Sequence, residues 1–162
     1  MLSIIIAILT AALDQITKLF CMRYLEPVGS VDIIPGIFRF TYVENRGAAF
    51  GSFAEHRWVF MISTTVVIAV LLYAIYKMRG RSRFLDVLLG LLLGGGVGNM
   101  IDRIRLGYVV DFLDFCAFDF WKWVFNVADC AVTVGAVMLA VYILFFYDKD
   151  KKRALSENND DE

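Results

Sequence analysis

Two long apolar runs in the sequence carry polar residues at one end. The first run ends in "GGGVGNMIDR", where Asp102 and Arg103 follow Asn99 by three and four positions, so all three can share one helical face. The second run begins with "FNVAD", where Asn126 and Asp129 are also three positions apart. An ionisable group near lipid costs roughly 2.5–3.5 kcal/mol on insertion scales, so these residues are candidates for a functional site.

A third segment, "GYVVDFLDF", lies between the two runs and adds two carboxylates. Its strand-like alternation places Asp111 on one side, pointing inward over the helix ends, and Asp114 on the other, pointing to water. The sequence offers no other carboxylate pair so placed as Asp111 and Asp129, and no nucleophile–base set. Two carboxylates held a few ångströms apart share a proton and titrate as a pair, which suits acid–base catalysis of hydrolysis.

The elements that must position these residues are long apolar segments. About 20 apolar residues, at about 1.5 Å rise each, cross a hydrocarbon core of about 30 Å. The chain of 162 residues is 59% hydrophobic, and four segments meet this length: residues 2–21, 58–76, 84–101 and 127–147. The sequence therefore predicts an all-α polytopic membrane protein with four transmembrane helices and a small extracytoplasmic β-sheet and loop region. Residues 1–153 are predicted to form one domain, and residues 154–162 a disordered cytoplasmic tail.

Basic residues indicate which way the chain crosses the membrane. The segments "KMRGRSR" and "DKDKKR" hold eight of the 16 Lys and Arg residues, and dense basic loops mark the cytoplasmic side. Both termini are therefore predicted to be cytoplasmic, and the connections 22–57 and 102–126 to lie outside. Within the first connection, residues 38–43 alternate as in a strand and lead to a glycine-marked turn. Because no basic segment precedes it, the apolar N-terminus is predicted to be an uncleaved first helix rather than a signal peptide.

Other residue types give weaker indications. A net charge of −1 does not favour nucleic acid as a partner, and the three cysteines have no metal-type spacing. His56, the single histidine, is interpreted as an interfacial residue rather than a general base. Asp14 and Lys18 form an i,i+4 pair that we expect to bond to neighbouring helices. Asp102 and Arg103 are expected to form an ion pair at a helix end.

Five blocks of the sequence, in order, resemble the motifs of the lipoprotein signal peptidases. They are "DQITK" (14–18), "NRGAAF" (45–50), "GGGVGNMIDR" (94–103), "GYVVDFLDF" (107–115) and "FNVAD" (125–129). Each block alone is a weak signal, but five in order at fitting spacing are a strong one. Gly96 replaces a more usual Ala and Cys130 a more usual Ser or Thr, and neither is a proposed catalytic group.

The resemblance implies a signal peptidase II, an aspartic endopeptidase of the bacterial cytoplasmic (inner) membrane with its active site near the outer face. Such an enzyme removes the signal peptide from diacylglyceryl-modified prolipoproteins, cleaving before the lipidated cysteine. The resemblance makes Asp111 and Asp129 the catalytic pair. It also implies residues that bind substrate, which are Asn45, Asn99, Arg103 and Asn126. The residues that it implies as supporting the site are Asp14, Lys18, Asp102 and Gly47.

The resemblance also implies partners. Membrane lipids surround the protein, globomycin-like inhibitors bind it, and the chain acts as a monomer without a metal or other cofactor. The helix dipole at the start of the fourth span favours Asp129 as the base, although the chemistry of the pair is symmetric. Two other functions remain open: a transporter or proton conductor that uses Asp14, Asp111 and Asp129 as a relay, and a non-enzymatic membrane scaffold.

Overall fold

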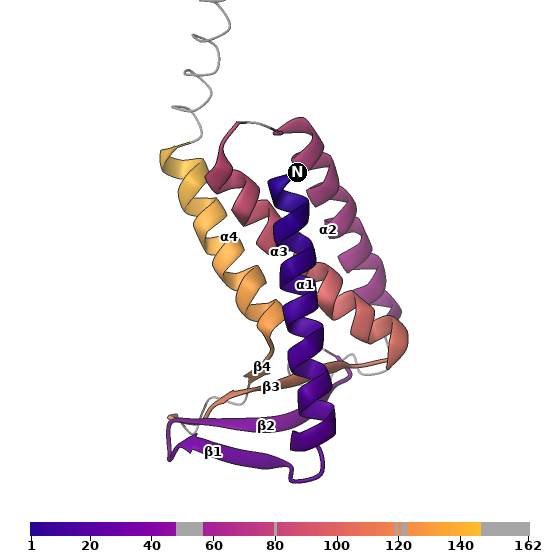
Figure 1. Cartoon of the computed structure of the whole chain (residues 1–162), viewed down its shortest axis with the longest axis vertical. Helices are drawn as coiled ribbons and strands as arrows, with labels where there is room; N and C mark the ends of the chain where they lie inside the picture. The colour runs from indigo at the N-terminus through magenta and orange to yellow at the C-terminus, as the bar shows by residue number, and fades with distance from the viewer. Residues whose placement is uncertain (48–56, 80, 119, 121–122, 147–162) are drawn as a thin grey trace, which may run out of the picture.

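Four long helices run side by side, and a small antiparallel sheet lies across one end of them (Figure 1). This computed structural model describes residues 1–47, 57–79, 81–118, 120 and 123–146. The predicted tail, His56 and residues 48–50 of the second motif lie outside the described residues.

Each helix is long and apolar enough to cross a membrane. The helices are α1 (Leu2–Phe20), continued by a π-helical turn η1 (Cys21–Leu25), then α2 (Arg57–Lys77), α3 (Arg83–Arg105) and α4 (Val127–Phe145). The prediction of a polytopic membrane protein with four spans is thus confirmed. Helix α3 continues four residues past the predicted end because Asp102 is buried against α1, where Lys18 pairs with its charge.

Helix α3 packs against α1 and α4 through glycines that leave no room for a side chain. A Cβ atom on Gly94 would lie 2.6 Å from the carbonyl oxygen of Ala7 in α1. On Gly95, it would lie 2.5 Å from the carbonyl oxygen of Ala128 in α4. Gly94 and Gly95 thus let α1 and α4 approach α3 closely, which brings the polar ends of three helices together.

The outer faces of the helices are apolar and exposed. In α1, Ile8 is 63% exposed and Leu9 60%, and in α2 Val66 is 57% exposed and Val70 60%. Contiguous apolar surface of this extent is not stable against water and indicates contact with lipid. The chain is a multi-pass membrane protein.

The sheet has four strands in the order β1–β2–β3–β4. They are β1 (Ser30–Ile34), β2 (Phe38–Asn45), β3 (Val109–Phe115) and β4 (Val124–Phe125). The two predicted strands, in β2 and β3, are confirmed, and they pair antiparallel with Asn45 opposite Val109 and a register shift between Phe40 and Val43. The sheet lies at the end of the bundle opposite the N-terminus (Figure 1). That this end is extracytoplasmic remains a prediction.

The prediction that Asp114 points to water is wrong. The residue is only 6% exposed, because its Oδ2 atom accepts a 2.6 Å bond from Arg39 Nε and a 2.9 Å bond from Thr41 Oγ1. Both partners belong to β2, where Arg39 is the register partner of Asp114. The neighbouring strand thus covers a carboxylate that the sequence pattern alone places in solvent.

Candidate active site

Helix α4 begins with a capping box formed by two of the predicted site residues. The Asn126 Oδ1 atom accepts a 2.9 Å bond from the Asp129 backbone N–H. Asp129 Oδ2 in turn accepts a 3.2 Å bond from the Asn126 backbone N–H. An asparagine followed three residues later by an acidic side chain is a local signal for a helix start, and here the signal also fixes the Asp129 carboxylate.

Strand β3 brings Asp111 to the same place. Its Oδ1 atom accepts a 2.6 Å bond from Asn126 Nδ2, and its Oδ2 atom a 2.8 Å bond from Asn45 Nδ2 of β2. Asn126 is fully buried and therefore joins Asp111 of the sheet to the first turn of α4, which carries Asp129. The two aspartates, 18 positions apart in the sequence, share one asparagine as a neighbour.

Burial and charge both disfavour the ionised form of Asp111. The residue is 2% exposed, and this burial, together with the nearby charge of Asp129, raises the pKa of Asp111 to about 7. Hydrogen bonds from Asn45 and Asn126 and the positive charge of Lys18 oppose this shift. A carboxyl group with this pKa exists in both protonation states near neutral pH, as an acid–base catalyst requires.

Asn99 of α3 completes the polar centre. Its Nδ2 atom donates a 2.8 Å bond to Asp129 Oδ1. Its Oδ1 atom accepts from Asn126 Nδ2 at 3.1 Å and from Lys18 Nζ at 2.8 Å. The predicted pair of aspartates and the three predicted asparagines therefore form one connected group.

A buried ion triad next to this group joins α1 to α3. Lys18 Nζ lies 2.8 Å from Asp14 Oδ2 and 2.9 Å from Asp102 Oδ2. All three residues are at most 2% exposed. The i,i+4 pair in α1 was expected, and the structure adds Asp102 as its third member.

The expected ion pair between Asp102 and Arg103 is wrong. Asp102 pairs with Lys18 instead, because the inward face of α3 meets α1 at this level. Arg103 points elsewhere: its Nη1 atom bonds the carbonyl oxygen of Asn99 at 3.2 Å, and its guanidinium lies 5.6 Å from the centre of the Phe60 ring. Arg103 is thus anchored between α3 and α2.

Two further residues support the centre. Gln15 is not among the predicted site residues, although it follows Asp14 in the first motif; its Nε2 atom donates to Asp102 Oδ1 at 2.8 Å and to the Gly98 carbonyl at 3.1 Å. Its place in that motif is the signal that could have found it. The Gly47 backbone N–H donates to Asn45 Oδ1 at 3.2 Å, so this predicted supporting residue holds Asn45 in a turn.

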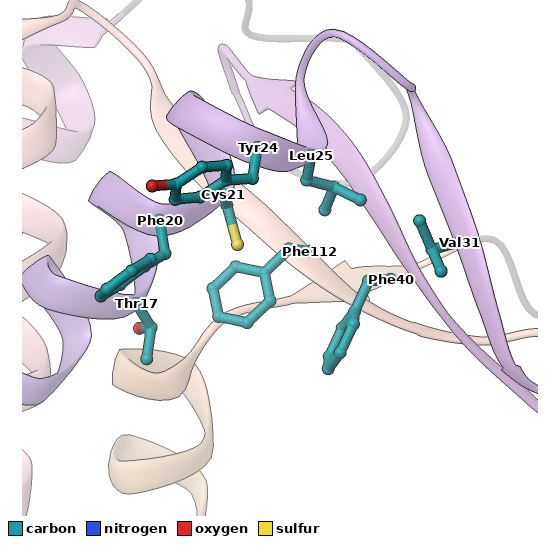
Figure 2. A pocket seen from close by; sticks show the side chains of 8 residues that line it. All are labelled: Thr17, Phe20, Cys21, Tyr24, Leu25, Val31, Phe40 and Phe112. Carbon is teal, nitrogen blue, oxygen red and sulfur yellow. The ribbon is translucent and has the colours of Figure 1, made fainter.

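An apolar cavity of about 450 Å³ lies between the end of α1, η1 and the sheet (Figure 2). The rings of Phe40 and Phe112 and the thiol of Cys21 point into it. Phe112 follows Asp111 in β3, so strand alternation turns the two side chains to opposite faces. Within the described parts of the chain, no cluster of three or more His, Cys, Asp or Glu side chains is arranged to hold a metal ion.

Together, the four spans and the hydrogen-bonded aspartate–asparagine centre define a polytopic membrane protein with a candidate acid–base site at one end of its helices. A family model described as signal peptidase (SPase) II matches residues 6–145. The chain belongs to this family of peptidases.

Named relatives agree with this family, and a solved membrane enzyme has a similar fold. The chain is 42% identical over 153 residues to a lipoprotein signal peptidase of Clostridioides difficile (strain 630), covering 93% of this chain and all of the relative. It is 45% identical over 144 residues to one of Caldanaerobacter subterraneus subsp. tengcongensis, covering 89% and 97%. A bacterial membrane enzyme structure solved by the in meso method at 1.9 Å resolution superposes with a TM-score of 0.77 at 32% identity, covering 89% of this chain and 93% of that chain.

Proposed function

We propose that this protein is an aspartic endopeptidase that removes the signal peptide from diacylglyceryl-modified prolipoproteins, cleaving before the lipidated cysteine. Relatives that match nearly the whole chain are named lipoprotein signal peptidases, which supports a prolipoprotein substrate. The observation that carries the aspartic mechanism is the contact of Asp111 and the first turn of α4 with the same buried Asn126.

In this mechanism Asp111 holds a proton and Asp129 receives one. A pKa near 7 lets Asp111 donate to the scissile carbonyl oxygen, while Asp129 takes a proton from the attacking water. The water oxygen then bonds to the carbonyl carbon and gives a tetrahedral intermediate with two hydroxyl groups. As the C–N bond breaks, the proton taken by Asp129 passes to the leaving nitrogen, and one hydroxyl proton of the intermediate returns to Asp111.

The asparagines orient the reacting groups without adding charge. Each oxygen of Asp111 accepts a hydrogen bond from the side-chain amide of an asparagine. One of these two hydrogen bonds must therefore break when the carboxyl group donates to substrate. Asn45 is only partly buried at the end of β2, whereas Asn126 is fully buried. Asn45 is therefore the amide that yields, and its freed Nδ2 can donate to the substrate backbone. Asn99, Asn126 and Arg103 keep the other groups in place.

The proposed setting follows from the same features. The polar centre lies at the sheet end of the helices, which we assign to the outer face of the bacterial cytoplasmic membrane, with both termini cytoplasmic. The protein acts as a monomer among membrane lipids, and globomycin-like inhibitors occupy the substrate site.

The test is cleavage of a diacylglyceryl-modified prolipoprotein by the purified protein in detergent. Asp111→Asn and Asp129→Asn should each abolish cleavage while the protein remains folded. Asp114→Asn is the matched control, because Asp114 lies in the same strand but bonds Arg39 and Thr41, and it should keep activity within a few fold. Full cleavage by either of the first two variants would exclude that residue from the mechanism.

A second arm of the assay concerns metal ions. Because the aspartate pair supplies both the acid and the base, EDTA should leave the rate unchanged. Loss of activity on adding EDTA, restored by a divalent cation, would favour a metal-dependent reaction over the one proposed.

A further inference from the structure

Lys18 is a fully buried cation whose three N–H donors each have an acceptor. These acceptors are Asp14 Oδ2 at 2.8 Å, Asp102 Oδ2 at 2.9 Å and Asn99 Oδ1 at 2.8 Å. The side chain is 1% exposed, so no water replaces any of these bonds. A buried ion group of this kind is weak evidence for stability, because a well-packed apolar substitute is often as stable. The placement of its partners gives a better reason for it.

Each carboxylate of the triad also accepts a backbone N–H beside one aspartate of the pair. Asp14 Oδ1 accepts from the N–H of Ala128, the residue before Asp129, at 2.9 Å. Asp102 Oδ2 accepts from the N–H of Val110, the residue before Asp111, at 3.1 Å. The first bond ties the start of α4 to α1, and the second ties β3 to α3.

The third partner of Lys18 reaches Asp129 directly. Asn99 accepts from Lys18 through Oδ1 and donates to Asp129 Oδ1 through Nδ2 at 2.8 Å. Polarising the amide oxygen in this way strengthens the amide as a donor, because bonds in a chain reinforce one another. Three separate connections therefore lead from one ammonium group to the two aspartates.

We propose that Lys18 is a positioning residue that sets the distance and orientation of Asp111 relative to Asp129 through Asp14, Asp102 and Asn99. This inference rests on the proposed function, in which those two aspartates are the acid and the base. Without the ammonium group, the two buried carboxylates repel each other, and α1 and α3 separate at this level. The backbone segments that they hold then move apart, and the aspartates with them.

The main variant is Lys18→Met, which has a side chain of similar length without charge. A misplacement of about 1 Å can cost about a hundredfold in rate, so kcat should fall by about that factor while KM changes less than threefold. Ser3→Ala is the matched control, since Ser3 is fully buried and its Oγ bonds Asp86 Oδ1 at 2.6 Å between the same two helices, far from the site. It should keep wild-type kcat.

A second variant separates geometry from charge and from folding. Lys18→Met with Asp14→Asn keeps the net charge of the triad at −1 and leaves an acceptor for the Ala128 N–H, but it removes the bridge. It should fold and still show the low kcat. If both variants failed to fold, Lys18 would be needed for stability and the positioning role would be overturned.

The pH profile tests whether Lys18 acts on Asp111 in the folded protein, which a role in folding stability alone does not require. The charged groups that face Asp111 are Lys18 from α1, Arg103 from α3 and Asp129 from α4. The charge of Lys18 lowers the pKa of Asp111, so in Lys18→Met the alkaline limb of the profile should move to higher pH. An unchanged limb, with any loss of rate accounted for by the folded fraction, would overturn the inference. A wild-type protein that cleaves no prolipoprotein would instead refute the proposed function itself.

Discussion

At the scale of single residues, Asn126 has two roles that can be separated. Its Oδ1 atom caps α4, and its Nδ2 atom donates to Asp111 and Asn99. Serine caps a helix as well as asparagine does but has no amide group, whereas alanine has neither a capping oxygen nor an amide. Loss of a cap costs about 1 kcal/mol of stability.

Both Asn126→Ser and Asn126→Ala should therefore lose cleavage activity, by about tenfold or more, because Asp111 loses its link to α4. The serine variant should unfold at a higher temperature than the alanine variant. Steady-state cleavage and thermal unfolding in detergent measure the two effects. Near-wild-type activity in the serine variant would contradict the link between the aspartates.

The pKa of Asp111 predicts how activity depends on pH. Burial and the charge of Asp129 raise this pKa to about 7, above the usual value for an aspartate. The proposed reaction needs the proton on Asp111, so kcat/KM should fall as pH rises through about 7. Below pH 7 it should be maintained, down to the low pH at which the base Asp129 also becomes protonated. A profile of kcat/KM against pH measures this, and activity that is level from pH 6 to pH 9 would contradict it.

At the scale of elements, two adjacent glycines in α3 should respond in opposite ways to the same methyl group. A Cβ atom on Gly95 would lie 2.5 Å from the Ala128 carbonyl oxygen and 2.7 Å from Val132 Cγ2. On Gly96, the nearest atom is Ile68 Cγ1 at 3.7 Å, an ordinary contact. Only the first position fixes the approach of α4 to α3.

Gly95→Ala should destabilise the protein by about 1–3 kcal/mol and reduce cleavage, because it pushes the Asp129 end of α4 away from α3. Gly96→Ala should be neutral or stabilising by up to about 1 kcal/mol, because alanine is the better helix former. Thermal unfolding and cleavage rates check both. Equal loss in the two variants would mean that helix flexibility, rather than close packing, is the reason for the glycines.

The sequence predicted the elements with a strong local pattern and missed those that depend on a neighbour. Apolar length indicates the spans, and alternation indicates β2 and β3. The exposed edge strand β1 and the two-residue strand β4 have no such pattern. They form because they pair with β2 and β3, respectively. For the same reason the burial of Asp114 and the pairing of Asp102 with Lys18 were missed: a partner on another element decides each of them. The motif resemblance made the asparagines substrate-binding residues, and their hydrogen bonds to the aspartates were not predicted.

At the scale of the whole molecule, the chain separates two environments. Apolar residues are exposed along the outer faces of the helices, while the buried charged side chains of the described residues gather toward the sheet end. A peptidase built this way keeps its buried charged groups away from lipid. The same arrangement disfavours a proton relay, which needs ionisable groups through the full depth of the membrane.

The orientation of this arrangement in the membrane can be tested with two matched cysteines. Ser30 is exposed at the start of β1, and Ser82 lies just before α3 at the other end of the bundle. Ser→Cys changes the volume little at either position, and neither residue carries a charge that sets the topology.

The dense basic segments predict that the Ser82 end is cytoplasmic. In a variant without Cys21, Cys116 and Cys130, a membrane-impermeant maleimide should therefore label Ser30→Cys in intact spheroplasts. It should label Ser82→Cys only after the membrane is permeabilised. The reverse pattern would place the aspartate pair on the cytoplasmic side, where it could not meet a signal peptide whose protein has crossed the membrane.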